Sequence, residues 1–145
     1  LLVMTQEDKN LLLQDLCGRI PYGVKCISGV DDKTLIIEGI NPNSNGASQI
    51  QVTYECSGIN FDTKISTIKP YLFPMSSMTE EQKEKYQELC ETTPIYDNYY
   101  GIETLRGYEY KDTLHSIDWL VENHFDYRGL IPMGLAIDAT NLNIY

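Results

Sequence analysis

The sequence predicts a single α+β domain over residues 1–145, in which about three helices pack on a three-stranded antiparallel sheet. Three observations support this fold class. The 145 residues are 42% apolar, a content that can bury a core in a chain of one-domain length. Three stretches between residues 23 and 56 have strand character, and three others carry helix-capping residues followed by apolar residues at helical spacing. Residues 1–4 are expected to form a flexible N-terminus.

The first helix is expected to begin after Thr5, a good N-cap, and to end at Gly18 and Pro21. A hairpin over residues 23–40 follows, because two strand-like runs flank a turn of small and acidic residues. The apolar face of the first helix is expected to hold Leu11, Leu12, Leu16 and Cys17.

Residues 41–46 form a loop by composition, and it is expected to connect the hairpin to a third strand at 49–56 with a period of two. Residues 57–69 are ambiguous: Ile59 and Phe61 fit a strand, whereas Ile65 and Ile68 fit one face of a short helix. We prefer a helix at 62–68. The next apolar segment, 70–78, contains two prolines and is expected to cross the core in an extended form.

The second helix is expected from Thr79, which opens a capping-box pattern, to about Cys90, with Tyr86 and Leu89 as its contacts to the core. The third helix is expected from about residue 113 and ends before Gly129, whose lack of a side chain permits a positive φ. Residues 130–137 are then expected to form a docked tail or an edge strand. The apolar stripe of this helix is expected to hold Leu114, Ile117, Leu120, Val121 and either His124 or Phe125.

Residues 92–111 are rich in tyrosine and short of apolar runs. One interpretation is a long connection, or a helix fragment at 99–105, held by tyrosine rings. The other is a protein-contact surface, since tyrosine is favoured at interfaces. Trp119 lies off the apolar stripe of the third helix, so it is either covered by another element or joins this contact. The candidate contact residues are Tyr96, Tyr99, Tyr100, Tyr108, Tyr110 and Trp119.

Charge and cysteine content argue against several classes of function. The net charge is −10, and residues 71–145 carry thirteen acidic residues against five basic ones. Such acidity disfavours binding to nucleic acid and to anionic membranes, and no apolar run is long enough to span a bilayer. The helix–strand–strand–strand–helix order resembles double-stranded-RNA-binding domains, but the basic stripe is missing. Four scattered cysteines indicate buried, reduced thiols in a cytoplasmic protein and no metal site.

The densest polar cluster follows the third helix and holds His124, Asp126 and Arg128. A histidine beside these charges suggests a general base in a small enzyme or ligand-binding protein. The alternative is that Asp126 and Arg128 fasten the chain as it leaves the helix. We favour this alternative, because no nucleophile, oxyanion donor or phosphate loop accompanies the cluster. We therefore expect no catalytic residue, metal or cofactor.

Several stretches resemble short uncharacterised proteins of gut Bacteroidetes that are often found near prophages or other mobile elements. The stretches are PYLFPMSSMTEE at 70–81, DWL at 118–120, HFDYRGLI at 124–131, GLA at 134–136, MTQEDK at 4–9 and PYGV at 21–24. That family carries no assigned activity, so the resemblance implies only a bacterial or phage-derived, intracellular protein. Together, these observations predict a non-enzymatic interaction module with an unidentified protein partner.

Overall fold

The computed structural model describes residues 4–44, 47–90, 92–110 and 113–145; within these, it leaves out the side chains of 42–44, 47–49, 92–97, 99, 104, 106–110, 113 and 114. The chain divides into two units: unit 1 holds Leu1–Ser77 and Val121–Tyr145, and unit 2 holds Met78–Leu120. Unit 2 is thus inserted into the sequence of unit 1. Whether both units fold as one domain stays a prediction.

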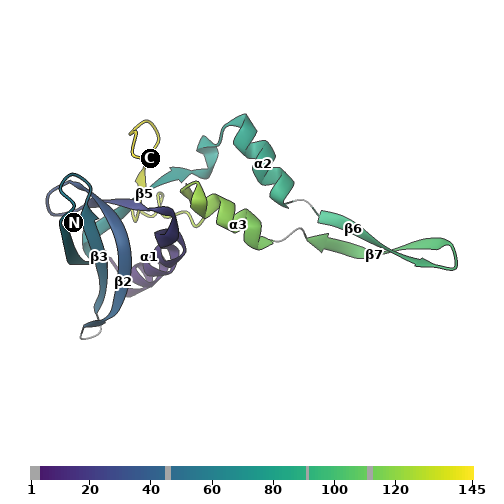
Figure 1. Cartoon of the computed structure of the whole chain (residues 1–145), viewed down its shortest axis with the longest axis horizontal. Coiled ribbons are helices and arrows are strands. Elements are labelled where there is room, and N and C mark those ends of the chain that lie inside the picture. Colours follow the sequence, from purple (N-terminus) through teal and green to yellow (C-terminus); the bar gives the residue numbers. More distant parts are fainter. Residues whose placement is uncertain (1–3, 45–46, 91, 111–112) are drawn as a thin grey trace. The chain divides into compact units, whose positions relative to one another are not determined.

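Unit 1 is built on one mixed sheet in the strand order β4-β3-β2-β1-β5-β8, with β9 also paired to β5 (Figure 1). Strands β1 to β5 pair antiparallel, and β8 and β9 run parallel to β5. The predicted three-stranded antiparallel sheet is therefore wrong. The strands are β1 (Lys25–Ser28), β2 (Thr34–Ser44), β3 (Ala47–Tyr54), β4 (Asn60–Lys64), β5 (Ile68–Pro74), β8 (Phe125–Asp126) and β9 (Ile137–Asp138).

The first helix, α1 (Gln6–Arg19), confirms the prediction of an N-cap at Thr5. The Thr5 side chain accepts a hydrogen bond from the Asp8 amide, and the Asp8 side chain accepts one from the Thr5 amide. The helix does not end at Gly18, because its hydrogen bonds continue to Arg19 and a 3-10 turn, η1 (Ile20–Tyr22), accommodates Pro21. Pro21 fits there because the first turn of a helix needs no amide donor.

The region after the first hairpin differs from the sequence prediction. The predicted loop at 41–46 is wrong for 41–44, where β2 continues to Ser44, and residues 45–46 lie outside the described part. The predicted helix at 62–68 is wrong as well: β4 is followed by a 3-10 turn, η2 (Ile65–Thr67). Ile65 and Ile68 are both buried, but from this turn and from the start of β5, so their spacing imitated a helical face.

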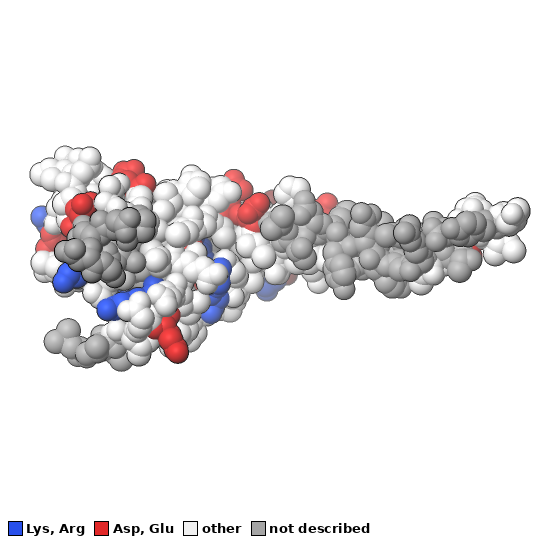
Figure 2. Space-filling view, turned by 90° about the horizontal axis from the view of Figure 1, so that it is seen from below, with Lys and Arg blue, Asp and Glu red and all other residues white. Residues whose placement is uncertain are grey.

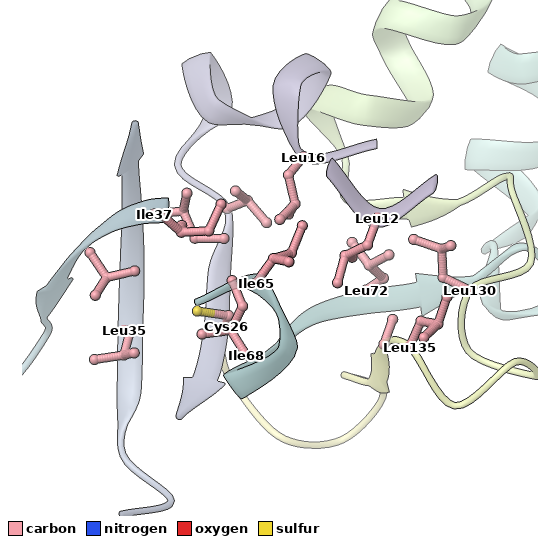
Figure 3. Close-up of a cluster of buried hydrophobic side chains, with 14 residues drawn as sticks. Leu12, Leu16, Cys26, Leu35, Ile37, Ile65, Ile68, Leu72, Leu130 and Leu135 are labelled. Atoms are coloured by element: carbon pink, nitrogen blue, oxygen red, sulfur yellow. The ribbon is translucent and has the colours of Figure 1, made fainter. Parts of the chain in front are cut away.

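The core of unit 1 lies between α1 and one face of the sheet (Figure 3). Leu12 and Leu16 of α1 are fully buried against residues of four strands. The tail supplies Leu130 and Leu135 to the same cluster, so the predicted docked tail is confirmed. Cys17, which was expected on this face, is exposed. Partners from the sheet and its turns include Val24, Cys26, Leu35, Ile37, Ile50, Val52, Ile65, Ile68 and Leu72.

Unit 2 contains α2 (Glu80–Cys90), β6 (Thr92–Tyr99), β7 (Ile102–Tyr110) and most of α3 (Thr113–Glu122). The last two residues of α3, Val121 and Glu122, belong to unit 1. Strands β6 and β7 form an antiparallel hairpin. The predictions of a long connection or of a helix fragment at 99–105 are therefore wrong. Period-two alternation was hard to see there, because tyrosine and threonine occupy positions on both faces. In the described residues, no helix is both long enough and apolar enough to cross a membrane.

In the described residues of α3, the predicted apolar stripe fails at Ile117. Leu120, Val121 and Phe125 are buried as expected, but Ile117 is 41% exposed and Ser116 is buried instead. The side chain of Leu114 lies outside the described part.

The hydroxyl of Tyr145 completes the sheet where β1 and β5 separate. The pairing between these strands ends at Cys26 and Pro70, so Lys25 and Tyr71 are the next residues that lie opposite each other. The Lys25 amide donates to the Tyr145 hydroxyl at 3.0 Å, and that hydroxyl donates to the Tyr71 carbonyl at 2.8 Å. A phenol group thus bridges two backbone groups that would otherwise face each other in the ladder.

Replacing Tyr145 by Phe is expected to lower the free energy of unfolding by about 1–2 kcal/mol, because the Lys25 amide and the Tyr71 carbonyl lose their bridging partner. Urea denaturation followed by circular dichroism measures this change. Tyr22→Phe removes the same hydroxyl from a tyrosine that is 38% exposed, and it serves as the control. Equal unfolding energies for the two variants would contradict the bridging role of Tyr145.

Candidate functional site

The tip of the β6–β7 hairpin is the first candidate site. Tyr99 and Ile102 form the last strand pair, so Tyr100 and Gly101 make a two-residue loop. Both loop residues have positive φ, 53° and 81°. This is the signature of a type I′ turn, which favours Asn, Asp or Gly at its first position. Tyr100 is therefore in a backbone conformation that a bulky side chain rarely adopts.

The tip exposes apolar side chains in the described part of unit 2. Tyr100 is fully exposed, Ile102 is 68% exposed and Leu105 is 49% exposed. The sequence predicted a contact role for Tyr100 but for neither aliphatic residue. The other predicted tyrosines are backbone members of the hairpin whose side chains lie outside the described part: Tyr96, Tyr99, Tyr108 and Tyr110.

Trp119 is covered in part by α2. Its ring stacks on that of Tyr86 with 6.2 Å between ring centroids and 23° between planes. Trp119 is half-buried, and no residue of α2 is fully buried. This contact favours the interpretation in which a second element covers the tryptophan. It also makes Trp119 a poorer contact residue than Tyr100.

The second candidate site is the polar cluster after α3, in which Asp126 has a structural task. Asp126 is 5% exposed. One of its carboxylate oxygens accepts from the Leu130 amide at 2.8 Å, and the other accepts from the Ile131 amide at 2.8 Å. Both oxygens thus hold the turn around Gly129, whose φ of +76° confirms the predicted positive value. A carboxylate occupied by two backbone donors is poorly placed to orient a catalytic histidine.

Arg128 contacts a buried ion pair that the sequence analysis missed. Asp15 and Arg19, four residues apart on α1, pair at 2.7 Å with both side chains inaccessible to solvent. Arg19 also donates to the Phe125 carbonyl at 2.7 Å, and Arg128 approaches Asp15 at 3.4 Å. Both guanidinium groups lie near the Tyr127 ring, at 5.6 and 5.1 Å from its centroid.

The sequence did contain a signal for this pair. Asp15 and Arg19 occupy positions three and seven residues beyond Leu12, so they share the buried stripe of α1. Charged residues on a buried stripe require partners. The structure shows that the two residues pair with each other and that their further partners, the Phe125 carbonyl and Arg128, come from a segment more than a hundred residues away in sequence.

His124 lies just beyond α3 with a φ of +62° and stacks on Tyr145, with 3.6 Å between ring centroids. Burial, and then the positive charges of Arg19 and Lys25, lower its pKa from 6.5 to about 4. Its Nδ1 atom is buried without a hydrogen-bond partner in the described part of the chain. The ring is therefore neutral at pH 7 and points into packing contacts.

The three predicted cluster residues are thus adjacent in sequence but serve separate contacts. Asp126 holds a turn, Arg128 pairs with α1 and His124 packs on Tyr145. This arrangement agrees with the favoured interpretation, in which the cluster fastens the chain beyond the helix.

The cysteines differ from the expectation of buried thiols, since only Cys26 is buried. Burial raises the pKa of its thiol to about 12, so it is unreactive. All four cysteines are free. Within the described ranges, no three His, Cys, Asp or Glu side chains come together as metal ligands.

The described surface of unit 1 includes a hollow of about 620 Å³ that is lined by Glu38, Gln51, Val52, Asn60, Phe61 and Asp62. A smaller hollow, of about 450 Å³, lies beside Met4, Val30, Lys69 and Met133. Neither is lined by the predicted polar cluster. On the face drawn in Figure 2, acidic and basic side chains are interspersed over the surface of unit 1.

Replacing Asp15 by Asn is expected to lower the free energy of unfolding by about 3–5 kcal/mol, because it leaves the Arg19 guanidinium charged and buried without its counter-ion. Chemical denaturation measures the loss. Lys83→Gln, which breaks an exposed pair with Glu80, is the control and is expected to cost no more than about 0.5 kcal/mol. A double variant, Asp15→Leu with Arg19→Met, is expected to recover part of the loss. A change as small as that of the control would show that the buried pair is unimportant.

Stability is expected to fall as the pH decreases from 6.5 to 4, because the folded-state pKa of His124 is about 4 and the unfolded chain binds the proton first. The His124 contribution is about 1 kcal/mol, since solvent reaches part of the ring. His124→Asn keeps a residue that tolerates positive φ and is expected to flatten this pH dependence. Denaturation at several pH values tests the slope, and an NMR titration midpoint near 6.5 would contradict it.

Comparisons of this chain with protein-family models, with curated proteins and with solved structures found no match.

Proposed function

We propose that this protein is a non-enzymatic interaction module that binds a protein partner through the hairpin tip, defined here as Tyr100, Ile102 and Leu105. The observation that carries the proposal is the combination of full exposure and positive φ at Tyr100. A tyrosine in this conformation costs about 1 kcal/mol relative to the residues that suit the turn.

The turn itself does not explain this tyrosine. Asn-Gly would form the same two-residue loop with less strain, and the exposed ring buries no surface in the described part of unit 2. Strained residues with exposed aromatic rings are characteristic of contact sites, where the ring enters a pocket of the partner. Ile102 and Leu105 add apolar surface on the strand that leaves the turn.

The charge of unit 2 indicates what kind of pocket the partner offers. Residues 78–120 contain ten acidic residues against four basic ones. A partner with an apolar pocket surrounded by lysine and arginine would complement both the tip and this charge, and electrostatic attraction would speed the encounter.

The proposed setting is the cytoplasm, because the four cysteines are free in the structure and disulfides are rare in that compartment. The resemblance of the segments around Pro70–Glu81 and His124–Ile131 to proteins found near mobile elements supports a prophage or mobile-element origin.

Replacing Tyr100 by Asn is expected to abolish partner binding while keeping or raising stability by about 0.5–1 kcal/mol, because Asn tolerates the positive φ and removes only the ring. The measurement has two arms. Thermal denaturation reports stability, and capture from a lysate of the source organism followed by mass spectrometry reports the partner.

A photo-reactive benzoyl-phenylalanine at position 100 identifies the contact directly by cross-linking the partner. The control places the same group at Tyr22, an exposed tyrosine of unit 1. Loss of stability in Tyr100→Asn together with unchanged capture would mean that the ring serves the fold and not a partner.

A further inference from the structure

The outer edge of β4 presents backbone groups that no described residue pairs. β4 is the last strand on its side of the sheet and pairs with β3 alone. The Tyr54 amide donates to the Ile59 carbonyl, so Tyr54 and Ile59 form a hydrogen-bonded pair. Because such pairs alternate along an antiparallel ladder, the amides and carbonyls of Asn60 and Asp62 point away from β3.

The side chains of these two residues lie on the outer face of the sheet. Phe61 is opposite Val52, which belongs to the buried core, so Asn60 and Asp62 face the other way. Gln51 is the neighbour of Asp62 across the ladder, and its own partner on β2 is Gly39. Glu38 lies next to Gly39 at a bulge of β2 and also lines the hollow. Gln51, Asn60 and Asp62 line the same 620 Å³ hollow, which thus lies directly beside the open edge.

We propose that the open edge of β4 binds an extended, basic peptide segment of a partner protein by strand addition, with a cationic side chain opposite Asp62 and over the hollow. The segment would hydrogen-bond with the free amides and carbonyls of Asn60 and Asp62. A residue directly opposite Asp62 on the same face would have its Cβ at roughly 5 Å from that of Asp62, which suits a salt bridge. Its long side chain would lie over Gln51, in the field of Glu38.

The charge pattern favours a basic segment over a second copy of this chain. Two β4 strands paired antiparallel about Asp62 would place one Asp62 against the other, and like charges directly opposite are destabilising. Pairing about Thr63 would instead place Asp62 opposite Lys64, and in that register the repulsion between two chains of like net charge is what opposes a second copy. The chain as a whole also carries a net charge of −10. A lysine- or arginine-containing strand avoids the repulsion at Asp62 and the repulsion between like net charges, and it complements Glu38 and Asp62.

The test uses the full chain, labelled with ¹⁵N, and a ten-residue peptide in which arginine alternates with valine. Titration at low salt is expected to shift the amide signals of Asn60 and Asp62 and to slow their hydrogen exchange. A peptide with glutamate in place of arginine controls for charge. A peptide that is N-methylated at alternate amides controls for backbone pairing, and it is expected to bind at least about tenfold more weakly.

Two variants separate charge from backbone pairing on the protein. Asp62→Pro removes an outward-pointing amide without removing a bond to β3 and is expected to weaken binding about tenfold or more. Asp62→Asn keeps the amide and is expected to weaken binding about three- to tenfold at low salt. Glu7→Gln, which removes an exposed charge from α1, is the matched control and is expected to leave the affinity unchanged. Tyr100→Asn is also expected to leave it unchanged, which keeps this edge distinct from the hairpin tip.

The absence of shifts at about 1 mM peptide would overturn the proposal. Equal binding of the N-methylated peptide, or equal weakening by Glu7→Gln and Asp62→Asn, would also overturn it, because the attraction would then be general and not strand addition. Exchange protection confined to Asn60 and Asp62, lost in Asp62→Pro, would establish it.

Discussion

The buried ion pair between Asp15 and Arg19 is the interaction on which the rest of unit 1 depends. Burying two charges is costly unless each finds close, well-directed partners. Here, Arg19 contacts Asp15 with two nitrogens and also donates to the Phe125 carbonyl, while Asp15 meets Arg128. Helix α1 is thereby joined to a segment that follows unit 2 in sequence. Loss of either charge would therefore leave an unpaired ion in the core and weaken the attachment of that segment.

Strand β5 has the corresponding role in the sheet. Its first half pairs with β1, and its second half pairs with β8 and β9 from the tail. The buried turn held by Asp126 fastens the tail between β8 and β9, and the hydroxyl of Tyr145 fastens it beyond β9. Unit 1 thus keeps a continuous sheet although its sequence is interrupted, and the hydrogen bonds of Asp126 and Tyr145 contribute to this continuity.

Local signals predicted the parts of this chain that local interactions determine. The capping residues Thr5 and Thr79 marked the starts of α1 and α2, and the hairpin at 23–40 followed from its turn composition. Strands β8 and β9 were not predictable in this way, because they are two residues long and owe their form to β5. At the hairpin tip, the sequence predicted a contact role for Tyr100 but not the hairpin itself, since Tyr-Gly is an unusual turn sequence. The positions of Asp15 and Arg19 on the apolar stripe of α1 indicated burial, but their contacts with the Phe125 carbonyl and Arg128 could not be predicted, because these groups lie more than a hundred residues away in sequence.

The position of β5 in the sequence also determines when this strand can complete its pairing during synthesis. When β5 leaves the ribosome, only β1 is available to it, and the residues that form β8 and β9 follow after all of unit 2. Until then, the backbone groups of residues 71–74 lack their later partners, and apolar side chains such as Leu72 lack the cover that the tail provides. A nascent chain that has not yet been synthesised beyond unit 2 therefore exposes an unpaired half of β5, and unpaired strand edges of this kind are prone to aggregation.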